Sequence, residues 1–289
     1  MELYSLEVFL TVVTERSFSR AAQKLYRTQP AISLALQRLE QEVGEKLIDR
    51  GPKDFTLTDA GRTVVEYARR FVNLEQELRN SLTELRDKSA GRLTIGANES
   101  ATLYLLRHIE RYRELYPGVK ITIRRSRSSV IPNELLDGNL EMGVISYDPA
   151  DERIHTRKIF SDSLVFVVSP KHRLANRKSI SIVELGGETF VAHDVVSPYR
   201  ELVIRVFREH KVPLCIELEM PTIDTIRKLV QGNLGVAFLP RMCVEQEIEQ
   251  KLLHEVHVKE MHLSRNIFLV YHARRALSHA ARAFLELVG

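Results

Sequence analysis

The sequence is poor in cysteine. Its 289 residues include two cysteines, Cys215 and Cys243, and no Cys-x-x-Cys pair. Two cysteines are too few for a disulfide framework, and their spacing is not that of a zinc or redox motif. We therefore interpret both as structural thiols. The alternative is redox sensing, although neither cysteine has a neighbouring motif that would activate its thiol.

Long apolar runs and a secretory leader are also lacking. A membrane-spanning helix needs about 18 uninterrupted apolar residues, whereas runs such as 164–168 have only the length of a strand. The first twenty residues include Glu2, Glu7 and Glu15 and show no basic start followed by an apolar block. The sequence therefore predicts a cytoplasmic protein without a membrane partner.

Enzyme motifs are absent as well. The sequence contains no nucleophile elbow, phosphate-binding loop or zinc-hydrolase helix, so it predicts neither catalysis nor a cofactor. Three histidines, His254, His257 and His262, lie close together in the sequence and could suggest a metal site. On a strand, however, His257 would point away from the other two, so we expect no metal ligation.

Composition and length indicate a folded chain of about two domains. Hydrophobic residues make up 44% and charged residues 28% of the chain, as in ordinary globular proteins. The formal net charge is +4 and the isoelectric point is near 9.0, which permits a polyanionic partner. Positive charge is concentrated at 16–39, a stretch without acidic residues that holds Arg16, Arg20, Lys24, Arg27 and Arg38.

The N-terminal 40 residues have the periodicity of three helices. Apolar residues three and four positions apart predict a first helix that ends near Arg16. Ser19 is the expected N-cap of a short second helix, and Thr28 caps a third that has Pro30 in its first turn. Two helices joined by a tight turn, with a basic block, predict a helix-turn-helix whose second helix enters the major groove of DNA. The alternative is an ordinary helical hairpin.

Residues 47–61 and the helix that follows extend this pattern. Gly-Pro between two short β-prone stretches predicts a hairpin, which we interpret as a wing. From Thr58 the helical period returns, and its apolar positions have the a/d spacing of a coiled-coil seam. This helix is expected to form a dimer interface or, alternatively, a solvated strut; the seam positions are Val64, Tyr67, Phe71, Leu74, Leu78, Ser81 and Leu85.

From residue 91 strands and helices alternate. This order predicts an α/β domain with a largely parallel sheet. The expected strands are 93–97, 119–125, 142–146, 164–168, 190–193, 215–220, 235–239 and 267–271, and the expected helices include 103–116, 132–137 and 278–288.

Several motifs resemble one family. The run SFSRAAQKLYRTQPAISLALQRLEQEVGEKLIDR followed by LTDAG, and the later LLDGNLEMGVI and GNLGVAFLP, are similar to the landmarks of LysR-type transcriptional regulators along essentially the whole chain. The resemblance implies a winged helix-turn-helix DNA-binding domain at 1–58, a dimerising linker helix at 59–90, and an effector domain at 91–289 similar to periplasmic binding proteins. It further implies an effector domain of two α/β subdomains, the first comprising 91–160 and 267–289 and the second 161–266.

The same resemblance implies the partners. They are double-stranded promoter DNA, a small-molecule effector and further copies of the chain, as a homodimer assembling into a homotetramer; RNA polymerase is a further candidate. The crossovers between the subdomains fall at Phe160-Ser161 and Arg265-Asn266. Two rival functions stay open: a solute-binding or sequestering protein that uses the α/β half alone, and a regulator that acts without ligand control.

The DNA contacts follow from the resemblance and from side-chain chemistry. Gln29 can pair with both adenine edge atoms, Ser33 can reach a purine edge or a phosphate, and a wing arginine can enter a narrow minor groove. Leu34 and Ala35 stand where the family often has long polar residues, which predicts fewer phosphate contacts from mid-helix. The expected DNA-binding residues are Ser19, Arg20, Thr28, Gln29, Pro30, Ser33, Gln37, Arg38, Arg50 and Lys53.

Two turns are expected to line an effector cleft. Residues 98–102 follow a strand and open a helix, so their amides and hydroxyls attract an anion, although a plain N-cap is the alternative. In the next turn, at 126–129, an arginine suits a carboxylate or phosphate unless it faces solvent. The expected effector-binding residues are Asn98, Ser100, Ala101, Thr102, Arg127, Ser128, Ser129, Ser146 and His193.

These residues predict a small anionic effector, a carboxylate rather than a phosphate. Glu99 lies on the first turn and carries the opposite implication. We expect its side chain to point out of the cleft. If it points in, a neutral or cationic effector becomes preferable.

Overall fold

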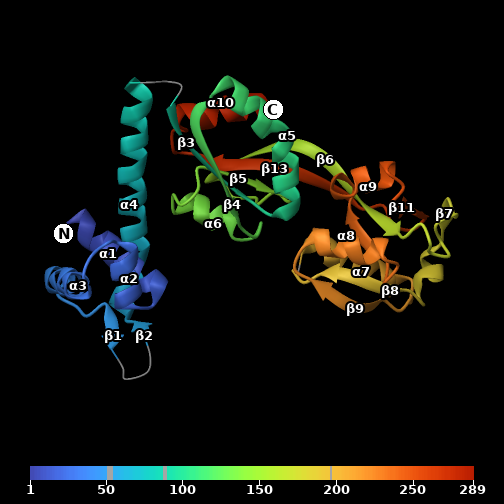
Figure 1. The fold of residues 1–289 in the computed structure, drawn as a ribbon, viewed down its shortest axis with the longest axis horizontal. Coiled ribbons are helices and arrows are strands. Elements are labelled where there is room, and N and C mark those ends of the chain that lie inside the picture. The colour runs from blue at the N-terminus through green and yellow to red at the C-terminus, as the bar shows by residue number, and fades with distance from the viewer. Residues whose placement is uncertain (51–54, 87–89, 196) are drawn as a thin grey trace.

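The computed structural model describes residues 1–50, 55–86, 90–195 and 197–289. Figure 1 shows a small helical N-terminal domain, one long helix, and an α/β body of two lobes. None of the helices in the described ranges is long and apolar enough to cross a membrane.

Three helices form the N-terminal domain. They are α1 (Leu3–Glu15), α2 (Phe18–Lys24) and α3 (Gln29–Val43), and they enclose fully buried Phe9, Ile32 and Leu36. The structure corrects the expected start of α2: Ser17, not Ser19, is its N-cap, and its hydroxyl accepts from the Arg20 amide. Ser17 still has an extended backbone, whereas Phe18 packs on the core and is already helical.

The predicted hairpin and linker helix are both present. β1 (Ile48–Arg50) pairs antiparallel with β2 (Phe55–Leu57), and α4 (Asp59–Arg86) follows. Gly61 in LTDAG allows a close approach, because a Cβ atom there would overlap the backbone oxygen of Leu47. The wing is thereby packed directly against the first turn of α4.

Along α4 the apolar face changes its environment. Val64 and Ala68 pack on the N-terminal core, whereas Tyr67, Phe71, Leu74 and Leu78 of the expected seam are 50–63% exposed. Leu82, outside the expected pattern, is 50% exposed on the same helix. The side chains of Ser81 and Leu85 lie outside the described part. A large apolar face of α4 is thus uncovered in the single chain.

Lobe I contains the first strands and helices of the α/β body together with its last helix. β3 (Ala90–Ala97) pairs parallel with β4 (Gly118–Arg125) and β5 (Met142–Ile145). The helices are α5 (Glu99–Leu115), α6 (Ile131–Leu136) and α10 (His279–Val288). Buried Leu93, Ile95, Tyr112 and Phe284 form the core between sheet and helices.

Two long strands connect the lobes. β6 (Ile154–Val168) and β13 (Ser264–His272) pair antiparallel and pass from one lobe to the other (Figure 1). The two expected crossover positions are neighbours in this pair, where Ser161 lies opposite Asn266. The expectation of a largely parallel sheet was wrong: the seven-stranded sheet, in the order β10-β6-β13-β5-β3-β4 with β11 beside β6, is mixed.

Lobe II is built around a parallel pair, β8 (Thr189–His193) and β9 (Cys215–Met220). Two helices that the sequence analysis did not delimit, α7 (Pro198–Glu209) and α8 (Ile223–Gln231), precede β9 and β10 (Ala237–Pro240). The shorter elements are β7 (Ser179–Ile180), η1 (Ile182–Leu185), η2 (Arg241–Cys243), α9 (Glu245–Glu249), β11 (His254–Glu255) and β12 (His257–Val258).

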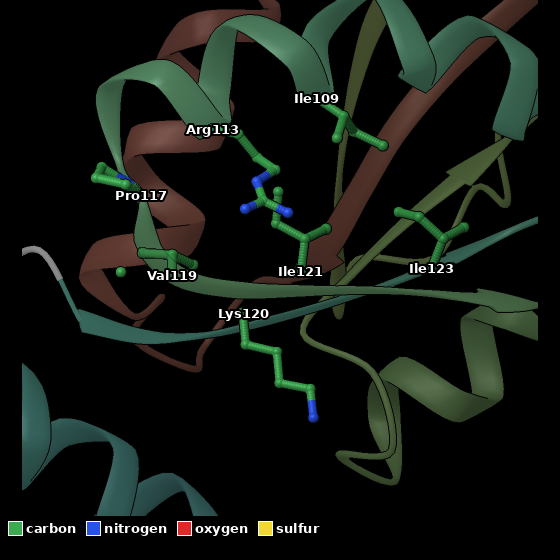
Figure 2. A pocket seen from close by; sticks show the side chains of 8 residues that line it. Ile109, Arg113, Pro117, Val119, Lys120, Ile121 and Ile123 are labelled. Carbon is green, nitrogen blue, oxygen red and sulfur yellow. The ribbon is translucent and has the colours of Figure 1, made fainter.

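Strand β4 forms one edge of the seven-stranded sheet. Alternation along the strand places Ile121 and Ile123 on the side of α5, with Ile109 and Arg113, and Lys120 on the opposite side (Figure 2). The hollow between them, about 430 Å³, shares no lining residue with the cleft between the lobes.

Candidate functional site

The first turns of α3 present the residues expected to contact DNA. Thr28, Gln29 and Pro30 are exposed and Ser33 is half-buried, while Ile32 is fully buried on the opposite face. The Gln29 amide donates to the Ser33 hydroxyl over 3.1 Å, so the two groups that can read base edges are adjacent. Gln37 and Arg38 are also exposed, further along α3.

The remaining expected DNA contacts are less uniform. Ser19 and Arg20 are exposed on α2, but Arg20 donates to the backbone oxygen of Glu15. Arg50 is in β1, with its side chain outside the described part, and Lys53 lies outside the described residues. Ala35 is 8% exposed and belongs to the core, so its departure from the family pattern removes no groove contact; Leu34, 48% exposed, does face outward.

A cleft of about 1080 Å³ lies between the lobes. Seven of the nine expected effector residues line it: Asn98, Ser100, Arg127, Ser128, Ser129, Ser146 and His193. Ala101 and Thr102 do not. Ala101 is 1% exposed in the core of lobe I, and the Thr102 hydroxyl donates to the Asn98 carbonyl, because both residues are already inside the first turn of α5.

The start of α5 is partly capped by its own residues. Asn98 accepts from the Ala101 amide over 2.8 Å and donates to Ser128 of the neighbouring turn over 2.9 Å. The Ser100 hydroxyl donates to the same Asn98 oxygen. The plain N-cap that the sequence left open is therefore present, and it also ties the two turns together. Fewer free amides remain for an anion than expected.

Arg265, expected from the sequence only as a crossover position, also lines the cleft. It is 5% exposed, donates to the Ser100 hydroxyl over 3.0 Å, and lies 3.8 Å from the Asp162 carboxylate across the crossover strands. Burial raises the pKa of Asp162, an effect that the nearby guanidinium opposes. The sequence does indicate that Arg265 is buried. It is two and four residues from buried Ile267 and Leu269, so on a strand its side chain lies on the same face as theirs.

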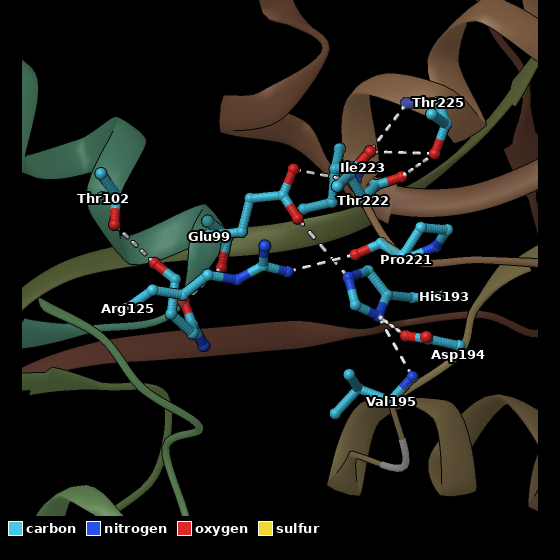
Figure 3. A network of polar contacts seen from close by, with 12 residues as sticks. Glu99, Thr102, Arg125, His193, Asp194, Val195, Pro221, Thr222, Ile223 and Thr225 are labelled. Carbon is cyan, nitrogen blue, oxygen red and sulfur yellow. Dashed lines mark hydrogen bonds and ion pairs between the residues drawn. The ribbon is translucent and has the colours of Figure 1, made fainter. Parts of the chain in front are cut away.

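Glu99 points into the cleft, contrary to expectation. One carboxylate oxygen accepts from the Ile223 amide at the start of α8 over 2.9 Å, and the other lies 3.5 Å from His193 Nε2 (Figure 3). The other ring nitrogen of His193, Nδ1, faces the Val195 amide at 3.1 Å and the Asp194 carboxylate at 3.2 Å. The N-terminus of α8 attracts the Glu99 carboxylate from the opposite lobe.

Two further contacts cross the cleft. Arg125 donates to the Pro221 carbonyl over 3.2 Å (Figure 3), and the Tyr199 hydroxyl donates to the Ser146 carbonyl over 2.6 Å. Arg127, in contrast, is exposed at the cleft. The contacts of Arg125, Tyr199 and Glu99 hold the two lobes against one another around the cavity.

The cleft is also connected to the linker helix. The turn at 126–130 leads into α6, and the loop after α6 contacts α4: Asn73 donates to the Asp137 carbonyl over 3.0 Å and to the Asn139 side chain over 3.1 Å. Glu77 of α4 forms an ion pair of 3.1 Å with Arg275. One short helix therefore spans the distance from the cleft to the linker.

The cysteines and histidines lie in ordinary environments. Burial raises the pKa of the Cys243 thiol to about 12, and the neighbouring Glu217 raises that of exposed Cys215. Neither thiol is thus activated for redox chemistry, which needs the thiolate. The expected opposition of His257 and His262 was wrong, because their rings are 6.2 Å apart; within the described ranges no three metal-binding side chains are grouped.

Comparisons with known proteins identify the family. Residues 3–62 match the bacterial regulatory helix-turn-helix proteins of the lysR family, and residues 86–289 match the LysR substrate binding domain. The chain belongs to the LysR family. It is therefore a DNA-binding transcriptional regulator with an effector-binding domain, and not an enzyme.

Individual relatives extend over the whole chain. A probable RuBisCO transcriptional regulator of Cyanidioschyzon merolae is 31% identical over 98% of this chain and 96% of its own. The crystal structure of full-length CbnR complexed with its target DNA has a TM-score of 0.75 at 18% identity and covers 100% of this chain and 99% of that one. The CcmR regulatory domain of Synechocystis PCC6803, in complex with 2-PG, has a TM-score of 0.62 at 21% identity, covering 68% of this chain and 95% of that one.

If Glu99 caps α8 across the cleft, Glu99→Ala exposes the Ile223 amide. We expect hydrogen exchange at Ile223 to accelerate at least severalfold, because its acceptor is lost. The matched control is Glu110→Ala, which removes an exposed carboxylate from the same helix α5. Unchanged exchange at Ile223 in Glu99→Ala would show that the contact does not persist in solution.

Proposed function

We propose that this LysR regulator binds promoter DNA through the first turns of α3 and the wing, acts in the cytoplasm as a homodimer that assembles further to a homotetramer, and changes its DNA contacts when a small anion enters the cleft. The adjacent side chains of exposed Gln29 and half-buried Ser33 support the assignment to the major groove. The exposed face of α4 supports dimerisation through the linker.

The charge of the cleft is the observation that carries the anionic effector. Its lining includes four arginines, Arg125, Arg127, Arg200 and Arg265, and two acidic residues, Glu99 and Asp194. Arg200 is paired with Glu219 and Arg265 lies 3.8 Å from Asp162, so exposed Arg125 and Arg127 are the arginines that favour an anion. Glu99 points in, but the Ile223 amide and His193 already face its carboxylate. The oxygen near His193 has no hydrogen-bond partner in the described part of the chain, so the proposal of an anion depends on the arginines of the cleft. The CcmR domain with 2-PG supports small-molecule binding by a domain of this fold.

The recognition-helix assignment predicts a separation of specificity from stability. Gln29→Ala and Ser33→Ala should each weaken specific binding by about 1–3 kcal/mol, because they remove base-edge contacts, while leaving the unfolding temperature unchanged. Ile32→Ala should instead destabilise the domain by about 2–5 kcal/mol, because Ile32 is fully buried. Footprinting on the upstream intergenic DNA measures the first effect, with exposed Gln41→Ala as control. An unchanged preference of Gln29→Ala for operator over random DNA would refute the assignment.

The exposed apolar face of α4 predicts a dimer that dissociates when acidic residues are introduced into the seam. Phe71→Asp with Leu78→Asp should yield monomers and abolish tight operator binding, because an unpaired buried charge costs several kcal/mol and two half-sites need two tethered wings. Sedimentation measures the assembly state. Gln76→Asp adds a charge to the exposed face of α4 away from the seam and should leave the oligomer intact. A double variant that sediments like the wild type would refute the seam.

The effector proposal is tested by footprinting with and without small organic anions, starting with substrates of the neighbouring operon. We expect a bound anion to change the footprint. Ser100→Ala and Arg127→Ala should lose this response but retain DNA binding, because the wings are in a separate domain. If anions raise the unfolding temperature of the protein but none of them changes the footprint, the result favours a regulator that acts without ligand control.

A further inference from the structure

The cleft between the lobes has two chemically different ends. At one end lie Ser100, Ser146, Tyr199 and Arg265, all of which offer polar atoms. At the other, the lining comes from lobe II and is mostly apolar: Val203 and Ile204 on α7, Leu214 and Ile216 at β9, and Phe190 and Phe238 on β8 and β10. Arg200, which precedes Val203 on α7, also lines the cleft and is paired with Glu219. A molecule that fills the cleft must therefore match both environments.

Arg265 determines the chemistry of the polar end. Its side chain is 95% buried, and its Nε atom has no hydrogen-bond partner in the described part of the chain. The guanidinium carbon lies 5.3 Å from the centre of the Tyr199 ring. This Nε atom faces the Asp162 carboxylate at 3.8 Å, too far for a hydrogen bond, and Nη2 donates to Ser100. A buried guanidinium that lines the cleft offers positive charge and N–H donors, which suit a carboxylate.

The apolar end limits the rest of the ligand. A phosphorylated or dicarboxylic acid would bring a second charge against Ile204, Ile216 and Phe238, whose side chains offer neither a hydrogen bond nor an opposite charge to replace its lost hydration. An apolar group there is favoured because it removes hydrocarbon surface from water on both sides. The volume of about 1080 Å³ also exceeds what a two-carbon acid occupies.

Resting on the proposed function, we infer that the effector is a monocarboxylic acid with an aromatic or branched aliphatic body. Its carboxylate binds beside Arg265 and Ser100, and its body extends between α7 and strands β9 and β10. The Tyr199 ring, on α7 next to Arg265, lies where head and body meet.

The test is calorimetric titration of the full-length protein with a matched ligand series. The series is 3-phenylpropionate, 3-methylbutanoate, acetate, 3-phenylpropanol, inorganic phosphate and 2-phosphoglycolate. We expect 3-phenylpropionate to bind at least tenfold more tightly than acetate, which lacks the body, and than 3-phenylpropanol, which lacks the charge. The ligand comparison needs no protein variant and so does not depend on folding.

A pair of variants locates the body. Ile204→Asp should weaken 3-phenylpropionate at least tenfold and leave acetate unaffected, whereas Val183→Asp, on the exposed surface of the same lobe, should change neither. Near-ultraviolet circular dichroism checks that both variants are folded. If Ile204→Asp does not fold, Ile204→Ala, with a smaller expected loss for 3-phenylpropionate alone, replaces it.

The outcomes separate this inference from the proposed function. Tighter binding of phosphate or 2-phosphoglycolate than of both apolar acids overturns the inference and leaves an anionic effector standing. Equal binding of 3-phenylpropanol overturns the carboxylate. Binding by none of the apolar acids overturns the inference as well, and the proposed function fails only if no anion alters the footprint.

Discussion

The effector cleft depends on the paired strands β6 and β13, which carry the chain from one lobe to the other. Their ladder runs from Ser163 opposite Ser264 to Ile154 opposite His272, with a shift in register at Ile267/Phe268. A β-bulge of this kind increases the local twist and interrupts the hydrogen bonding. The pairing of the two strands is therefore irregular close to the crossover, and regular on both sides of it.

Arg265 and Asp162 make this crossover unusual. Both are almost completely buried, and removing one partner of a buried pair costs about 3–5 kcal/mol. The pair also contacts both lobes, because Arg265 donates to Ser100 of α5 and Asp162 accepts from the Met242 amide of η2. The charge that faces the cavity is thus held by the same residues that align the lobes.

Contacts on the lobe I side extend this arrangement to the linker. Asn98 joins the first cleft turn to Ser128 of the second, Ser126 donates to Glu134 within α6, and the loop after α6 accepts from Asn73 of α4. These contacts are contiguous and mostly hydrogen-bonded. These contacts connect the cleft turns, through one six-residue helix, to the helix that follows the DNA-binding domain.

Local patterns were sufficient to predict the helix-turn-helix, the wing and the linker, because periodicity and turn residues determine them within a few positions. The Ile32, Leu36 and Leu39 stripe is one case. The orientation of Glu99 could not be predicted, since its partner Ile223 is 124 positions away on a helix that the sequence did not delimit. The mixed sheet was missed because the residues of β6 between Ile154 and Val165 are exposed or half-buried, a weaker signal than the buried end of the strand at 165–168.

The contact between Glu99 and α8 places an internal competitor in the cleft. A ligand that displaces this carboxylate from the helix terminus must offset the loss of the Glu99–Ile223 contact, whatever its own chemistry. The strength of that contact therefore contributes to the affinity of every such ligand. Because Glu99 also lines the cavity, position 99 contributes both to how tightly a ligand binds and to which ligand is preferred.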